Sequence, residues 1–157
     1  MIRVGIGYDS HRFAAGRPLI LAGQTIPHSQ GLAGHSDADA VAHAVTDAIL
    51  GATASGDIGS LFPDTDEAWR GADSMRLLGL ALEMIGRRGF RVRQVDVTVV
   101  LEQPRLAPYR GAMAAALATV LGIAPSDVGV KAKTNEGMGF IGRGEGIAVM
   151  AVATVED

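Results

Sequence analysis

The segment 147–155 constrains the fold most, because it has the length and composition of a strand but is apolar on both of its faces. Residues 147–152 include no polar side chain, so neither face of this strand suits water. Strands of this kind occur where each side of the sheet is covered. Helices or another subunit must therefore cover both sides, and we expect the chain to be oligomeric.

The remaining periodicity predicts further strands with helices between them. The expected strands are Ile2–Phe13, Pro18–Ile26, Val92–Leu101, Val128–Lys133 and Ile147–Val155. The expected helices are Ala38–Ala52 with Asp37 as N-cap, a second one that begins at Asp73 or Ser74 and ends before Gly89, and Pro108–Leu121, which Gly122 ends. The first two strands are expected to form an outer hairpin, and a polar loop to fill residues 55–70. This order predicts one domain, residues 1–157, with the two-layer sandwich of an α/β or α+β fold.

The composition excludes several classes of protein. The chain has 14 basic and 17 acidic residues, a net charge of −3, which disfavours a nucleic-acid partner. It has no cysteine and therefore no disulfide, thiolate metal site or cysteine nucleophile. No stretch approaches the roughly 20 apolar residues of a membrane span, and the N-terminus lacks the pattern of a signal peptide. We therefore expect no membrane partner and a cytoplasmic location.

Three residues near the N-terminus have the character of metal ligands. Asp9 and His11 are two residues apart in the first expected strand, so their side chains point to the same face. His43 lies in the first expected helix, near enough in the chain to contact them, and three such ligands with an open fourth position are typical of a catalytic zinc site. Asp47, one helical turn after His43, is the expected acceptor for the second ring nitrogen of that histidine. His28 has no such neighbours and is interpreted as a surface residue.

Glycine makes up 21 of the 157 residues, about twice the usual share, and it gathers in segments suited to ligands. The loop Gly34–Asp37 precedes the first helix, whose N-terminal N–H groups are expected to bind an anion. Gly56–Gly59 offers a carboxylate beside flexible backbone, which suits a ribose diol, and Phe62–Asp66 forms a polar turn. Lys131–Glu136 combines cations, a hydroxyl and a carboxylate, which suits a diphosphate and a magnesium-type ion. The glycine-rich segment 137–146 suits turns and ligand binding equally.

Six motifs occur in order over most of the chain: GYDSHRF, GLAGHSDADAVAHAVTDAILGA, GDIGSLFPDTD, WRGADS, EQPRLAPY and KTNEGMGFIGRGEGIA. Together they resemble the family of 2-C-methyl-D-erythritol 2,4-cyclodiphosphate synthases. The resemblance implies a two-layer α+β sandwich, with one mixed sheet covered by helices, and a homotrimer whose active sites lie between subunits. It also implies an enzyme of the non-mevalonate isoprenoid pathway that acts on a cytidyl diphosphate.

The resemblance further implies roles for individual residues, with His35 and Thr134 as the catalytic residues. The implied metal ligands are Asp9, His11 and His43 for Zn²⁺ or another divalent cation, and Glu136 for Mg²⁺ or Mn²⁺ on the diphosphate. The implied substrate contacts of one subunit are Asp9, His11, His35, Ser36, Asp57, Ile58, Gly59, Phe62, Pro63, Asp64, Thr65 and Asp66. Those of its neighbour are Leu101, Glu102, Gln103, Pro104, Arg105, Leu106, Ala107, Lys133, Thr134, Asn135 and Glu136. Phe140 and Arg143 are implied to face the central cavity of the trimer and are included among the substrate contacts. Arg105 stands where the family often has lysine, which keeps the charge but changes the shape.

The implied reaction is an intramolecular phosphoryl transfer by a phosphorus–oxygen lyase. An oxygen of the 2-phosphate of 4-diphosphocytidyl-2-C-methyl-D-erythritol 2-phosphate attacks the β-phosphorus and expels CMP, which closes the cyclic diphosphate. The nucleophile is already an anion at neutral pH, so positioning and charge neutralisation matter more than a strong general base. Two other functions fit the same residues. One is a zinc-dependent hydrolase, which would release a linear product; the other is a non-catalytic protein that binds isoprenoid diphosphates or nucleotides around a structural metal.

Overall fold

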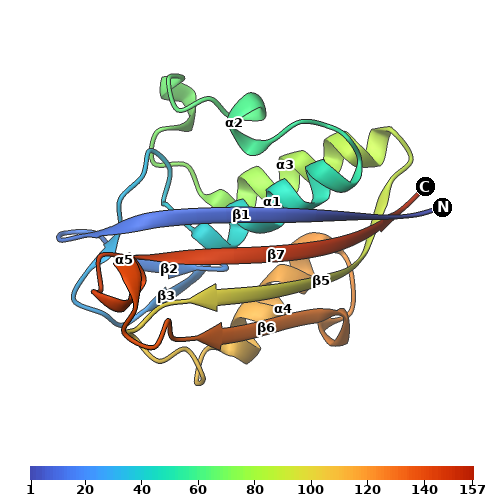
Figure 1. Ribbon diagram of the computed structural model, residues 1–157. Coiled ribbons are helices and arrows are strands. Elements are labelled where there is room, and N and C mark those ends of the chain that lie inside the picture. The colour runs from blue at the N-terminus through green and yellow to red at the C-terminus, as the bar shows by residue number, and fades with distance from the viewer.

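A five-stranded mixed sheet forms one layer of the molecule in the computed structural model, which describes residues 1–157 (Figure 1). Its strands, in spatial order, are β4 (Gly31–Leu32), β1 (Ile2–Ala14), β7 (Gly146–Glu156), β5 (Arg91–Val100) and β6 (Val128–Lys133). β1 and β7 are antiparallel from Ile2 opposite Glu156 to Arg12 opposite Gly146. β5 is antiparallel to β7 and parallel to β6, with α4 in the connection between them.

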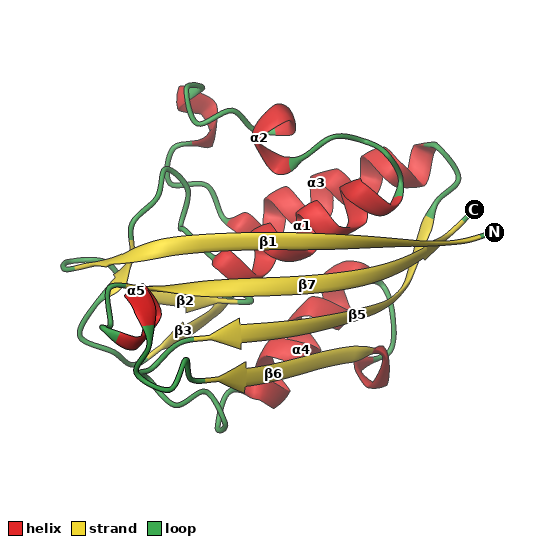
Figure 2. Ribbon diagram, viewed as in Figure 1, coloured by secondary structure: helices red, strands yellow, loops and turns green.

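The three long helices form the second layer on one face of this sheet (Figure 2). They are α1 (Ala40–Ala52), α3 (Ser74–Arg87) and α4 (Arg110–Leu121). Four short helices lie in the loops: α2 (Ile58–Leu61), α5 (Gly139–Gly142), and the 3₁₀ helices η1 (Glu67–Trp69) and η2 (Pro125–Asp127). The result is an α+β fold with a mixed sheet covered by helices. None of the helices has both the length and the apolar character that a membrane crossing needs.

The contact between β1 and α1 is close because β1 has glycine where it faces the helix. A Cβ atom at Gly5 would lie 2.0 Å from the carbonyl oxygen of Ala48, and one at Gly7 would lie 1.9 Å from that of Ala44. Both positions therefore tolerate only glycine, whose side chain is a single hydrogen atom. The next residues on the same face of β1 are Asp9 and His11, so this close packing brings them near the first turn of α1.

The start of α1 differs from the sequence prediction. The helix begins at Ala40 and its N-cap is Asp39, whereas the sequence predicted Asp37. The fully buried carboxylate of Asp39 accepts the N–H groups of Val41 and Ala42 and also those of Ala22 and Gly23. The N–H groups of Val41 and Ala42 are thus already paired with a carboxylate, so the anion site that the sequence predicts at this helix end does not form at these two groups. Asp37 and Asp39 suit an N-cap equally well as judged from the local sequence. Only the tertiary contacts of Asp39 with residues 22 and 23 distinguish the two.

The segment Pro18–Ile26 is a hairpin by itself and not a single strand. β2 (Leu19–Leu21) pairs with β3 (Gln24–Ile26), and Ala22 and Gly23 between them both have positive φ, as tight two-residue hairpin turns require. β1 pairs with β4 and β7 instead of this segment. The polar loop 55–70 likewise contains α2 and η1, and α4 begins two residues after the predicted Pro108.

The helices cover only one face of the sheet. On that face Val95, Val97 and Val99 of β5 are fully buried, as the sequence predicted. The other face carries large apolar side chains that are 40–70% exposed in the isolated chain. They are Ile2, Val4, Ile6 and Tyr8 of β1 and Met150 and Val152 of β7.

Candidate metal centre

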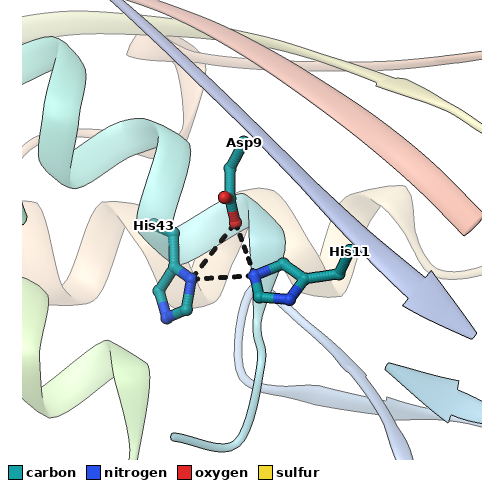
Figure 3. Close-up of side chains that lie close together, drawn as sticks. All are labelled: Asp9, His11 and His43. Carbon is teal, nitrogen blue, oxygen red and sulfur yellow. Dashed lines mark hydrogen bonds and ion pairs between the residues drawn. The ribbon is translucent and has the colours of Figure 1, made fainter. Parts of the chain in front are cut away.

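The side chains of Asp9, His11 and His43 converge on one point between β1 and α1 (Figure 3). Asp9 Oδ2 lies 2.8 Å from His11 Nε2 and 3.1 Å from His43 Nδ1, and the two ring nitrogens are 3.2 Å apart. Zinc with ligands at about 2.0–2.1 Å in tetrahedral geometry sets its donor atoms about 3.3 Å apart. The three donor atoms therefore have nearly the spacing that one such cation requires.

Hydrogen bonds on the far side of each ring leave the converging nitrogens with free lone pairs. His11 donates Nδ1–H to the carbonyl oxygen of Ala33 at 2.6 Å, which leaves Nε2 unprotonated in the neutral ring. His43 Nε2 lies 2.8 Å from Ser74 Oγ, so Nδ1 is its free nitrogen. In the metal-free protein a proton on either nitrogen can bridge it to Asp9. Once these protons are lost, two lone pairs and a carboxylate oxygen face one point, so the donor set fits a divalent metal ion.

The charges of this cluster shift two pKa values. Burial would raise the pKa of Asp9, but hydrogen bonds and charge attraction from His11 and His43 outweigh burial and lower it. Burial would lower the pKa of His11, but its hydrogen bond to Asp9 and the negative charge of that residue raise the pKa above 6.5. Near neutral pH, Asp9 is therefore ionised, and His11 is the group at which protons compete with a metal.

Zinc is expected to stabilise the protein more strongly as the pH rises from about 6 to about 8. In the metal-free protein, the Asp9–His11 pair stabilises the fold below the unfolded pKa of His11. This contribution to stability is lost as the pH rises through the raised pKa of His11 in the folded protein. Zinc binding has the opposite dependence, because His11 must lose its proton first, and affinity should fall about tenfold per pH unit below that pKa. Melting curves with and without zinc at several pH values measure this, and a zinc effect that does not change with pH would contradict it.

The sequence predicts that Asp47 accepts a hydrogen bond from His43, and this prediction is wrong. Its Oδ1 accepts the N–H of Ile58 at 2.7 Å, and burial raises its pKa. The second ring nitrogen of His43 meets Ser74 instead, a residue remote in sequence, so helical spacing gave no signal for it.

A cavity of about 420 Å³ opens beside the three ligands. It is lined by His11, Gly34, His35, Ser36, His43, Ile58, Gly59, Phe62, Pro63, Asp64, Trp69 and Leu77. His35 lines the cavity, and its Nε2 is buried without a hydrogen-bond partner in the chain, which leaves this nitrogen unpaired. Trp69, which packs edge-on against Phe62 at a centroid distance of 5.0 Å, and Leu77 were missed by the sequence analysis.

Four of the residues predicted as substrate contacts near this cavity do not line it: Asp9, which lies among the three ligands, and three residues of the loop 57–66. Asp57 is exposed and caps α2 by accepting hydrogen bonds from the N–H and hydroxyl of Ser60, which lower the pKa of Asp57. Asp66 caps η1 through the N–H of Ala68, and Thr65 lies in the exposed turn before it. The loop thus presents Ile58 to Asp64, but not its two ends, to the cavity.

Most of the residues predicted to bind a cytidyl diphosphate gather at the end of β6, around a second cavity of about 170 Å³, but Gln103, Asn135 and Glu136 are not in its lining. Its lining consists of Leu101, Glu102, Pro104, Arg105, Leu106, Ala107, Ala132, Lys133 and Thr134. Glu102 accepts the N–H of Asn135 at 2.8 Å and so ties the two segments together. Glu136 has a positive φ of 52° and lies 3.3 Å from the hydroxyl of Thr134. The two cavities share no lining residue, so one chain carries the two groups apart from each other.

Phe140 and Arg143 lie at α5, near the end of β1. Phe140 is 41% exposed and lines a cavity of about 180 Å³ with Ser10, Arg12 and Glu145 among others. Arg143 pairs with Glu145 at 2.9 Å on the surface. Lys131, in contrast, pairs with Asp96 on the neighbouring strand and does not join the group at the end of β6.

Comparison with known families agrees with this architecture. The model of the YgbB family matches residues 2–156. The chain belongs to the YgbB family. A relative from Syntrophus aciditrophicus (strain SB), named 2-C-methyl-D-erythritol 2,4-cyclodiphosphate synthase, is 54% identical over 99% of this chain and 98% of its own length.

Solved structures of other YgbB-like proteins share the fold. A 2C-methyl-D-erythritol-2,4-cyclodiphosphate synthase in its CDP-bound form has a TM-score of 0.90 and 40% identity over 98% of this chain and 100% of its own. The bifunctional IspDF of Campylobacter jejuni has a TM-score of 0.95 and 43% identity over 99% of this chain, which spans 42% of that longer protein.

Proposed function

We propose that this member of the YgbB family converts 4-diphosphocytidyl-2-C-methyl-D-erythritol 2-phosphate to 2-C-methyl-D-erythritol 2,4-cyclodiphosphate and CMP, as a phosphorus–oxygen lyase of the non-mevalonate isoprenoid pathway. The single observation that carries the proposal is the cavity beside Asp9, His11 and His43, in a chain 54% identical to a relative of that name. The existence of a CDP-bound member of the family supports a cytidyl diphosphate as the ligand.

The reaction exchanges one P–O bond for another within the substrate. An oxygen of the 2-phosphate forms a bond to the β-phosphorus, the bond from that phosphorus to the bridging oxygen breaks, and the electron pair leaves with CMP. No water is consumed. The main barrier is the repulsion of two anionic phosphates held in line, which positioning and positive charge reduce.

Residues of one chain hold the methylerythritol end of the substrate. His35 has its buried Nε2 free to donate to the 2-phosphate, and Ser36 lies beside it in the wall of the cavity. Ile58, Gly59 and Phe62–Asp64 of the following loop, with Trp69, also line this cavity. A divalent cation at Asp9, His11 and His43, which we propose to be Zn²⁺, supplies positive charge to the phosphates when bound.

Residues at the end of β6 hold the cytidine and the diphosphate. Lys133 brings a positive charge to the second cavity, and the Thr134 hydroxyl is placed to donate to the diphosphate. Glu136 is the proposed protein ligand of Mg²⁺ or Mn²⁺ on the diphosphate, and such an ion would supply positive charge to the phosphates there. Leu101, Glu102 and Pro104–Ala107 form the wall that we propose receives the cytosine base.

We further propose that three copies of the chain assemble with the first cavity of one against the second cavity of its neighbour. The two halves are separate in one chain, and the uncovered sheet face carries exposed Ile2, Val4, Ile6, Tyr8, Met150 and Val152. A ring of copies around a threefold axis would cover that face and complete three sites. Phe140 and Arg143 would then lie near the axis.

Mixed assemblies test the shared site. We expect His43→Ala and Glu136→Gln to be inactive separately, and their mixture after subunit exchange to recover about one quarter of wild-type turnover, because random pairing joins two intact halves at about one site in four. Light scattering should give about three times the chain mass of 16.2 kDa. A mass of one chain, or a mixture as inactive as its parts, would contradict the shared site.

Metal removal tests the catalytic function against a purely binding one. We expect a chelator to abolish CMP release and added zinc with magnesium to restore it, because no basic side chain lies at Asp9, His11 and His43 to replace the charge of a divalent cation there. CMP is measured by chromatography. Full turnover by the metal-free protein would contradict the proposal.

A further inference from the structure

Ser74, which no substrate group is proposed to reach, is the fully buried partner of a metal-site histidine. It is the first residue of α3, and its side chain is 0% exposed. Its Oγ lies 2.8 Å from His43 Nε2 and 3.2 Å from Ser36 Oγ, and it also contacts a carboxylate oxygen of Asp37. A buried hydroxyl with three polar neighbours is in a fixed network.

The direction of each hydrogen bond in this network follows from the chemistry of its ends. The ionised carboxylate of Asp37 only accepts, so the hydroxyl proton of Ser74 points to Asp37. Ser74 Oγ gives its own proton to Asp37, so toward His43 it can only accept, and His43 donates to it from a protonated Nε2. The order is therefore His43 Nε2–H to Ser74, and Ser74 O–H to Asp37.

Asp37 is itself held in place by backbone groups of both adjoining helices. It accepts the N–H of Ser74 at 3.1 Å and the N–H of Asp39 at 3.1 Å. Its own N–H donates to the carbonyl oxygen of Ala72 at 3.0 Å. The carboxylate is thus a fixed negative charge at the end of the network.

We propose that Ser74 and Asp37 are positioning residues that hold His43 as the Nε2–H tautomer, with Nδ1 free for the divalent cation, and thereby tighten cation binding. The inference rests on the metal site proposed above and adds two residues to it. A carboxylate that acts on a metal-bound imidazole through a hydroxyl fixes the plane of the ring and increases the electron density on its ligating nitrogen. Ser36 Oγ, 3.1 Å from His43 Nε2, is the competing acceptor, but Ser36 also accepts the N–H of Ala38 and faces the cavity.

Zinc affinity of the full chain, measured by competition with a chromophoric chelator, tests this proposal. We expect Ser74→Ala to bind zinc about 10–100-fold more weakly than wild type, and Asp37→Asn about tenfold more weakly. Nitrogen–proton correlation spectra of the zinc-free protein should show Nε2–H for His43 in wild type and a mixture of tautomers in Ser74→Ala. A purely structural role for Ser74 would lower the melting temperature and leave the tautomer unchanged.

One control variant and four outcomes separate this proposal from others. Ser126→Ala changes an exposed serine of η2 and should alter neither affinity nor tautomer. A folded Ser74→Ala protein with affinity within twofold of wild type would overturn the proposal, as would a larger loss in Ser36→Ala than in Ser74→Ala. If Ser74→Ala does not fold, unchanged affinity and tautomer in Asp37→Asn would overturn it. Wild type that binds no zinc would instead contradict the metal site itself.

Discussion

His43→Ala is expected to fold and to lose both zinc and at least about 10³-fold in turnover. The lost ligand leaves only two of three donors, and a bound metal contributes several kcal/mol to the transition state, where about 1.4 kcal/mol corresponds to a factor of ten. The fold should persist because alanine favours the helix that holds this residue, and the His43 side chain is already 13% exposed. Zinc content, circular dichroism and turnover together measure the three effects.

His28→Ala is the matched control for this variant. His28 is exposed, and the one aromatic ring near it is that of Phe13, at a centroid distance of 5.4 Å. It should keep full zinc content and turnover. Normal turnover in metal-depleted His43→Ala would refute the catalytic metal, and loss of folding in that variant would indicate a structural one.

Gly7→Ala is expected to destabilise the protein by about 3 kcal/mol or more and to weaken zinc binding about tenfold or more. The new Cβ would lie 1.9 Å from the carbonyl oxygen of Ala44 and 2.8 Å from the nitrogen of Ala48, which are backbone atoms that cannot rotate away. α1 must therefore move from β1, and His43 moves with it away from Asp9. Urea unfolding of the zinc-free variant measures the first effect, and chelator competition measures the second.

Gly79→Ala provides the control for the loss of a glycine. Gly79 lies in α3, and a Cβ there would meet no atom within 4 Å. This variant should be stabilised by up to about 1 kcal/mol, because alanine has the higher helix propensity. A Gly7→Ala protein within 1 kcal/mol of wild type would contradict the account of the β1–α1 contact.

The sequence predicted those features that depend on local period. The spacing of Asp9 and His11 on one strand face, and the alternation of buried valines in β5, follow from the two-residue repeat of a strand. The six motifs, in turn, are sufficient to identify the family. The exposed face of β1, with alternate large apolar residues, completes the pattern of the terminal strand that first indicated an oligomer.

The features that the sequence could not predict depend on contacts between distant segments. Asp37 and Asp39 both suit an N-cap, and only the buried contacts with the β2–β3 turn select Asp39. Asp47 has the right helical spacing from His43, but Ser74, 31 residues away, occupies the site. The glycine excess was interpreted as ligand-facing, yet Gly7 is required by helix packing, which local sequence does not reveal.

The phosphorus spectrum of the reaction products tests the central claim most directly. Wild-type protein with zinc and magnesium should convert the cytidyl substrate to CMP and a product with two coupled phosphorus signals, because cyclisation preserves a P–O–P linkage. In ¹⁸O-labelled water, neither product should gain the label. A set of uncoupled monophosphate signals with one labelled oxygen would show that water is the nucleophile, and the protein would then be a hydrolase and not a cyclase.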